Sequence, residues 1–393
     1  MNRDWKKQRI SFFLGAGATK AVFPTAPLGD DLLPKILSYG QELNNNDYRE
    51  IMSKVENLKN FIDNIYGGQH YVPNNLPGIE DVLSLLDYNI KKRVSLTSKI
   101  KYEDVVDIRN DLVYFMCIVL NEALRGYNST IMEEFVCKLN NIVNPKISLI
   151  STNYDIVLDN QLQKKDIFNY GVLIRTTLEH KSSQSGNYDM AIGIGGKKHF
   201  SKAESKWEKP ISQKKENSGK IPLFKLHGSL NWLWCPRCEE LDITFLEKGA
   251  LWTQKGNFIC VSEYCTSPYQ ILIVSPTMFK IYDNRVIKKV WKEAEQAISH
   301  SDYIIFIGYS FPEADIHIRC MLTKAIASAE NRPKILVVDY KQDDSQEESA
   351  KLNKTRDRYK HLLGETIKFR TYGFEYFVKH IDNEINNLIN DNH

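Results

Sequence analysis

The stretch of sequence that decides the fold class reads Ile10-Ser-Phe-Phe-Leu-Gly15-Ala-Gly-Ala-Thr19. Its first five residues predict a buried strand, the glycines predict a tight turn, and a helical pattern follows. Such a turn lets a pyrophosphate approach the backbone, and the next helix offers free N–H groups at its start. A turn without a ligand explains the segment equally well, because Lys20 replaces the third glycine of the dinucleotide-binding pattern.

Strands and helices alternate along the rest of the chain. Apolar segments predict further strands at Ile147–Ser151, Leu223–Leu226, Ile271–Val274, Tyr303–Ile307 and Lys334–Val338. Helical patterns separate the last three. The alternation predicts a Rossmann-like α/β fold, a doubly wound parallel sheet with helices on both faces. We expect residues 30–140 to form a helical insertion, 180–219 a long loop, and 374–390 a C-terminal helix that caps the sheet.

Composition argues against two classes of protein. The 393 residues include 52 Lys plus Arg and 49 Asp plus Glu, a net charge of +3, which gives no support for direct nucleic-acid binding. No apolar run approaches the roughly 20 residues of a membrane helix. The basic, then apolar N-terminus imitates a signal peptide, but its apolar part is too short. We therefore expect a cytoplasmic protein with no membrane association.

Four of the seven cysteines are clustered in residues 235–265, namely Cys235, Cys238, Cys260 and Cys265. Two pairs at this separation predict a tetrahedral thiolate site for zinc (Zn²⁺), within a small zinc-ribbon-like module at residues 233–268. Four cysteine ligands would close the coordination sphere, so the ion would be structural. Metal-free cysteines in a degenerate ribbon are the alternative.

Polar groups follow four of the predicted strands. They are Thr152-Asn153-Tyr154-Asp155, His227-Gly228-Ser229, Gly308-Tyr309-Ser310 and Asp339. Ligands of open α/β sheets bind at the carboxyl ends of the strands, and a histidine there can act as a general base. Simpler explanations stay open: a helix N-cap for each aspartate, a plain turn at Gly308, and a structural role for His227.

These motifs, in this order, resemble the sirtuin superfamily. The stretch Ala21–Gly29 lacks the Phe-Arg pair usual in deacetylase sirtuins, and the helical insertion is unlike a compact deacetylase. The segments Ser151–Asp155, Leu226–Trp232 and Ile307–Phe311 instead resemble the sirtuin-like proteins of bacterial antiphage defence, which hydrolyse NAD. Residues 1–393 would then be one discontinuous SIR2-like NAD-binding domain. The resemblance further implies a homo-oligomer paired with a HerA-type ring ATPase.

The resemblance also assigns roles to residues. Asn153 would orient the ribose or the attacking water, Asp155 would support it, and His227 would be the base. The NAD-binding residues would be Gly15, Ala16, Gly17, Thr19, Thr152, Gly308, Ser310 and Asp339. Many defence members lack the four cysteines, which keeps an NAD-dependent protein deacylase as an alternative. A third possibility is a non-catalytic subunit that binds NAD or ADP-ribose.

Overall fold

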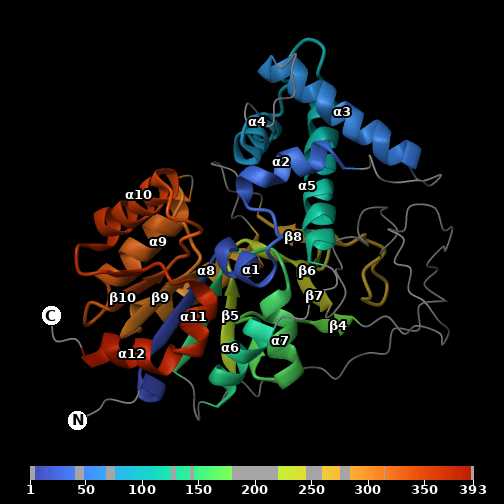
Figure 1. The fold of residues 1–393 in the computed structure, drawn as a ribbon. Coiled ribbons are helices and arrows are strands. Elements are labelled where there is room, and N and C mark those ends of the chain that lie inside the picture. The colour runs from blue at the N-terminus through green and yellow to red at the C-terminus, as the bar shows by residue number, and fades with distance from the viewer. Residues whose placement is uncertain are drawn as a thin grey trace.

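The computed structural model describes residues 5–39, 48–67, 76–124, 130–141, 146–178, 220–244, 259–274, 284–313 and 315–390 (Figure 1). Its centre is a seven-stranded sheet in the order β11-β10-β9-β1-β2-β5-β3. All pairs in this sheet are parallel. The strands are β1 (Ile10–Leu14), β2 (Ile147–Ser151), β3 (Phe168–Asn169), β5 (Ile221–Lys225), β9 (Tyr303–Ile307), β10 (Lys334–Val338) and β11 (Lys368–Arg370).

The central strands are apolar along their whole length because helices cover both faces of the sheet. Every residue of β1, β2 and β9 is buried. One packed group contains α8 (Arg285–Ser299), α9 (Ile316–Ala327) and α10 (Gln346–Leu363). The other contains α1 (Ala16–Val22), α6 (Thr130–Asn140), α7 (Val157–Lys165), α11 (Gly373–Lys379) and α12 (Ile381–Asn390). The chain runs outward from β1 in both directions, as in a doubly wound fold. The predicted fold class is confirmed.

A second, four-stranded sheet lies beside the first in the order β4-β7-β6-β8 (Figure 1). Its strands are β4 (Thr176–Leu178), β6 (Gly228–Cys235), β7 (Glu240–Thr244) and β8 (Gln270–Ile273). The placement of Ile271–Val274 in the parallel sheet was wrong, because β8 pairs antiparallel with β6. A short apolar run predicts a strand but does not tell which sheet it joins.

Four helices form a separate apolar core above the carboxyl ends of the parallel strands (Figure 1). They are α2 (Gly29–Leu37), α3 (Tyr48–Tyr66), α4 (Ile79–Lys92) and α5 (Tyr102–Ala123). Helix α6 packs with the main sheet instead, where Phe135 meets Phe12 with ring centroids 5.5 Å apart. Tyr154, Leu230 and two residues of β8 pack against the helical core and join it to the edge of the sheet.

The C-terminal segment departs from the prediction of a single helix over 374–390. It forms two helices, α11 and α12, which meet at His380. The backbone leaves the helical conformation there, at φ −115° and ψ 18°. Phe374, Phe377, Ile381 and Ile385 are buried in the main core, so the segment covers the sheet of its own chain. The predicted loop at 180–219 lies outside the described residues. No described helix is long and apolar enough to cross a bilayer.

Candidate functional site

Register brings the ends of five parallel strands into one line. Leu14 of β1 lies opposite Ile307 of β9 and Ser151 of β2, and these pair onward with Val338 of β10 and Lys225 of β5. The residues just beyond these ends are therefore neighbours at one edge, in the spatial order Asp339, Gly308, Gly15, Thr152 and His227, of which His227 is the second residue after its strand. The edge includes the place between β1 and β9 where strand order reverses, which is where open α/β sheets bind ligands.

The glycines of the turn after β1 pack directly against Gly308, which follows β9. The Gly17 N–H donates to the Gly308 carbonyl at 2.8 Å, and the Gly15 N–H donates to the Ile307 carbonyl at 3.0 Å. A Cβ atom on Gly15 would lie 2.6 Å from the Gly308 oxygen, and one on Gly17 would lie 2.8 Å from it. Gly308 itself has φ +59°. Close contact between the two loops thus requires glycine at these positions whether or not a ligand binds.

Asn153 and Asp155 converge on the beginning of α1. The Asn153 Nδ2 donates to the Gly15 carbonyl and to Thr19 Oγ1, both at 3.0 Å. Thr19 Oγ1 in turn donates to Asp155 Oδ2 at 2.8 Å. Since a carbonyl only accepts, the amide nitrogen of Asn153 must face Gly15, and its Oδ1 atom takes no hydrogen bond from described groups. Thr19 was predicted to bind NAD, but its hydroxyl group is hydrogen-bonded to the side chains of Asn153 and Asp155.

The helix-cap explanation applies to Asp155 in part and does not apply to Asp339. Asp155 Oδ1 accepts from the Val157 N–H at 3.0 Å, at the start of α7, while its other oxygen contacts Thr19. Helix α10 begins further on and is capped by Ser345. Asp339 instead accepts from the Tyr340 N–H at 2.9 Å, and burial raises the pKa of its carboxyl group. Ser310 is exposed on the same edge.

His227 is buried against the loop that carries Asn153. Its Nδ1 atom lies 3.2 Å from the Thr152 carbonyl, and its ring stacks on Tyr154 with centroids 6.0 Å apart. Because the carbonyl accepts, Nδ1 carries the proton and Nε2 is the basic nitrogen. The Tyr154 hydroxyl donates to the Val274 carbonyl at 2.7 Å, and the Val274 N–H donates to the His227 carbonyl at 2.9 Å. These contacts fix the ring at the end of β5.

Lys225 is a buried charged residue beside this loop that the sequence analysis did not single out. It is the last residue of β5, and only 1% of its side chain is exposed. Its Nζ donates to the Asp155 carbonyl and lies 3.1 Å from Asp159 Oδ2 in α7. A lysine inside an otherwise apolar strand, two residues before His227, was the available signal. Buried lysines are rare unless they are paired.

The four cysteines form a cluster whose dimensions fit zinc. Their sulfur atoms all lie within 4.8 Å of one another, with Cys235–Cys265 at 3.7 Å and Cys238–Cys260 at 3.9 Å. A tetrahedral ion with Zn–S bonds of about 2.3 Å requires sulfur separations of about 3.8 Å. All four are free thiols. The cluster could therefore hold zinc as a structural ion, with the four sulfurs as its ligands.

The guanidinium group of Arg175 contacts the cysteine cluster. The Arg175 Nη2 donates to Cys260 Sγ at 3.2 Å and to Asp242, whose side chain is fully buried. Tyr269 bridges them, because its hydroxyl donates to Asp242 at 2.5 Å and accepts from Arg175 at 3.1 Å. A guanidinium beside the sulfur atoms offsets the negative charge that four thiolates bring to one ion.

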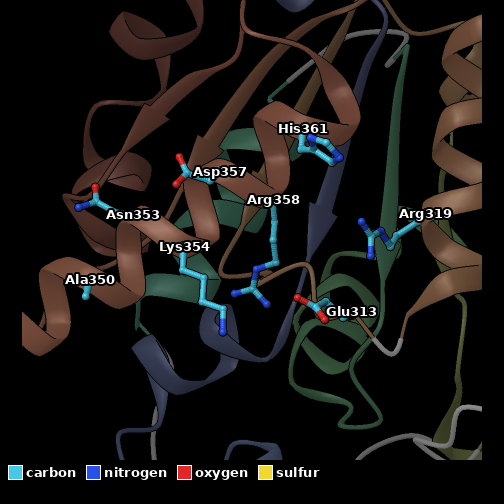
Figure 2. Close-up of a pocket in the computed structure, with 8 residues that line it drawn as sticks. All are labelled: Glu313, Arg319, Ala350, Asn353, Lys354, Asp357, Arg358 and His361. Carbon is cyan, nitrogen blue, oxygen red and sulfur yellow. The ribbon is translucent and has the colours of Figure 1, made fainter.

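The cavity drawn in Figure 2 is lined by other residues. Its volume is about 710 Å³, and it opens between the loop before α9 and the polar side of α10. The residues that line it carry charges of both signs, among them Glu313, Arg319, Lys354 and Arg358. None of the residues predicted for the site lines this cavity.

Comparison with known proteins gives one family. The model of the SIR2-like domain matches residues 147–362, more than half of the chain. A search of curated proteins gives no match. The matched range contains Asn153, His227, Gly308 and the four cysteines, while the glycine loop after β1 precedes it.

Among solved structures the chain is similar to Sir2 in complex with the inhibitor EX-527, 2'-O-acetyl-ADP-ribose and a deacetylated p53 peptide. The identity is 11%, the TM-score is 0.37, and the match covers 95% of this chain and 93% of that one. An Asn-for-His mutant and an Ala-for-Ser mutant of a Sir2 homologue, each with ADP-ribose, match at 11% and 12% identity. Both have TM-scores of 0.37 and cover 97% of this chain and 94% of theirs. It is the family model that places the protein: the chain belongs to the SIR2-like domain family.

Proposed function

We propose that this protein is an NAD⁺ glycohydrolase, which converts NAD⁺ to nicotinamide and ADP-ribose. The observation that carries the proposal is the alignment of strand ends, which brings the glycine loop, Asn153 and His227 to successive positions along the edge of the sheet that begins at the switch point. Membership of the SIR2-like family supports NAD⁺ as the substrate. The positive charge on the nicotinamide ring of NAD⁺ makes that ring a competent leaving group.

The residues of the edge then divide the work of binding and proton transfer. His227 presents Nε2 as the base that accepts a proton from water or from a ribose hydroxyl, since Nδ1 is committed to the Thr152 carbonyl. Asn153 presents Oδ1 as an acceptor that orients the same hydroxyl or water, because its amide nitrogen is held by Gly15 and Thr19. Asp155 holds Thr19 and thereby this orientation. The site mainly positions reactants and stabilises charge.

The remaining predicted residues belong to binding. Gly15, Ala16 and Gly17 line the turn over which a pyrophosphate would lie, with Thr152 beside them. Gly308, Ser310 and Asp339 occupy the far half of the edge, where the Asp339 carboxylate can accept from ribose hydroxyls. The backbone N–H of Ala16 donates to no described group, unlike that of Gly17, and is the donor we assign to the ligand.

The decisive experiment measures NAD⁺ consumption by the purified protein, alone and with an acetyl-lysine peptide. We expect nicotinamide and ADP-ribose to appear without peptide, and His227→Ala to abolish their formation. Turnover that requires the peptide would assign the protein to the deacylases. ADP-ribose binding without turnover, even with a HerA-type ATPase present, would make it a binding subunit.

The deacylase alternative is favoured by one observation, the zinc-compatible geometry of the four cysteines. The resemblance to antiphage proteins, in contrast, rests on the segments around Asn153, His227 and Tyr309. On that resemblance we propose that the protein acts in bacterial antiphage defence by depleting NAD⁺, as a homo-oligomer with a HerA-type ring ATPase. Co-expression with such an ATPase, followed by mass measurement of the complex, tests the partnership.

A further inference from the structure

The loop that carries Asn153 is held through its main-chain carbonyls by one segment of the chain. The Thr152 carbonyl faces His227 Nδ1, and the Tyr154 carbonyl accepts from the Leu230 N–H at 2.9 Å. The Asp155 carbonyl accepts from Lys225 Nζ. Residues 225–230 thus hold residues 152–155 at three points. The Ser229 hydroxyl also donates to the Tyr154 carbonyl, at 3.4 Å. Among the donors of this segment, Lys225 alone supplies a charged side chain that the proposed chemistry does not use.

The ammonium group of Lys225 is itself held in place by a buried polar chain. Asp159 Oδ2 lies 3.1 Å from Nζ, and Asp159 Oδ1 accepts from the Tyr170 hydroxyl at 2.6 Å. That hydroxyl accepts from Asn231 Nδ2 at 3.0 Å, and the same Nδ2 donates to the Thr244 carbonyl at 2.8 Å. Lys225 and Asp159 are 1% and 0% exposed. The lysine is therefore fixed from behind by residues of α7 and of the second sheet.

A contribution to stability does not by itself explain why Lys225 and Asp159 form a buried ion pair. Taking an ammonium and a carboxylate out of water costs free energy that their attraction often fails to repay, and apolar residues of similar size would serve the core as well. What apolar residues would not supply is a donor to the Asp155 carbonyl. The next peptide units of the same loop carry Asn153 and Tyr154, so a movement of this carbonyl changes where the Asn153 amide points.

We propose that Lys225 is a positioning residue of the candidate site, and that Asp159 is the counterion that holds it. In this role the ammonium group fixes the Asp155 carbonyl and so fixes the orientation of Asn153 and of the Asp155 side chain. The inference rests on the proposed NAD⁺ cleavage for its catalytic consequence. Its structural part, the ordering of residues 152–160, stands apart from any activity.

The test uses the full chain and a pair of substitutions. Lys225→Met alone would leave the Asp159 carboxylate buried without its partner, and this variant can fail to fold. The double variant Lys225→Met/Asp159→Asn removes both charges, keeps the approximate volumes and keeps an acceptor for Tyr170. Arg332→Met is the matched control, because Arg332 Nη2 also donates to a main-chain carbonyl, that of Leu363 at 2.6 Å, in a part of the chain remote from the candidate site.

Three quantities are measured on the double variant, the control and the unchanged protein: thermal unfolding, hydrogen exchange of peptides covering residues 152–160, and kcat and KM for NAD⁺. We expect the double variant to unfold within a few degrees of the unchanged protein and to exchange at least tenfold faster in this segment. We expect its kcat to fall at least tenfold while KM changes less than threefold. Arg332→Met should leave exchange in this segment and kcat unchanged.

Two results would overturn the inference. Wild-type kcat in the double variant would show that Lys225 only neutralises Asp159, and unchanged exchange over 152–160 would show that the loop does not depend on the lysine. If the unchanged protein cleaves no NAD⁺ under any condition, the proposed function fails. The exchange measurement still decides the role of Lys225 in that case, so the two failures are told apart.

Discussion

The aligned strand ends and the cysteine cluster build two sites in opposite ways. The strand ends gather residues from positions 15 to 339 of the chain, and the backbone register of the sheet sets their geometry. The cysteine cluster gathers residues from 235 to 265; Cys235 ends strand β6, and the other three cysteines lie in turns and loops outside the strands. The geometry of the strand ends is therefore set by the fold itself, whereas the geometry of the cysteine cluster depends on the ion that its sulfur atoms bind.

The comparison predicts that a substitution at the strand ends removes activity and leaves the fold intact. His227→Ala should lower turnover of NAD⁺ by about 10²- to 10⁴-fold, the range of general acid–base catalysis. The melting temperature should fall by only a few degrees, because the sheet register does not depend on this ring. His361→Ala, an exposed histidine of α10, is the control. Normal turnover in His227→Ala would refute its role as the base.

A substitution in the cysteine cluster should instead lower stability and leave ligand binding at the strand ends nearly unchanged. Cys260→Ser should abolish the binding of one zinc ion per chain, measured by atomic absorption, and should lower the free energy of unfolding by several kcal/mol. ADP-ribose affinity of the folded fraction should change less than threefold. Cys320→Ser, at an exposed cysteine, should change none of these quantities. Equal stability of the unchanged protein with and without zinc would mean that the ribbon folds without metal.

The glycine contact between the two loops can be tested with a pair of matched substitutions. Gly17→Ala places a Cβ 2.8 Å from Gly308 Cα and from its carbonyl oxygen, and the strain should cost about 1–3 kcal/mol of unfolding free energy. Gly29→Ala, also in a helix, meets nothing within 4 Å and should be neutral or stabilising by up to about 1 kcal/mol. Chemical denaturation measures both. A neutral Gly17→Ala would show that the loops separate easily.

The smallest effect concerns Asp339. Burial raises the pKa of its carboxyl group, so ionisation is less favourable in the folded protein than in the unfolded chain. Its cost to stability therefore appears as pH rises through the window between the two pKa values, and it persists at neutral pH. Asp339→Asn should raise the melting temperature slightly at pH 7, and the difference should vanish below about pH 4. NAD⁺ binding should weaken in the same variant, and unaltered binding would remove Asp339 from the site.

Sequence patterns predicted local elements well where they were long or fully apolar. Strands β1, β2, β9 and β10 have the predicted bounds, because continuous apolar runs leave few alternatives. The break at His380 was missed, since α11 and α12 both bury apolar residues in the main core and read as one helix.

Contacts within the candidate site were harder to foresee than its location. Strand ends predicted which edge would carry polar groups, and the register confirms that these groups are neighbours. The sequence does not reveal that the Thr19 hydroxyl is occupied by Asn153 and Asp155, or that Lys225 reaches the Asp155 carbonyl. Such contacts depend on the relative placement of loops that are more than a hundred residues apart, or on separate strands, and no local pattern encodes that placement.

The row of strand ends also sets the length of a ligand that can contact both Asp339 and His227. Neighbouring strands of a sheet are about 4.8 Å apart, and four such steps separate Asp339 after β10 from His227 after β5, a span of about 19 Å. A molecule that touches both residues must lie stretched along the edge. A single nucleotide covers only part of this length, so a site that binds NAD⁺ as proposed would distinguish the dinucleotide from either of its halves.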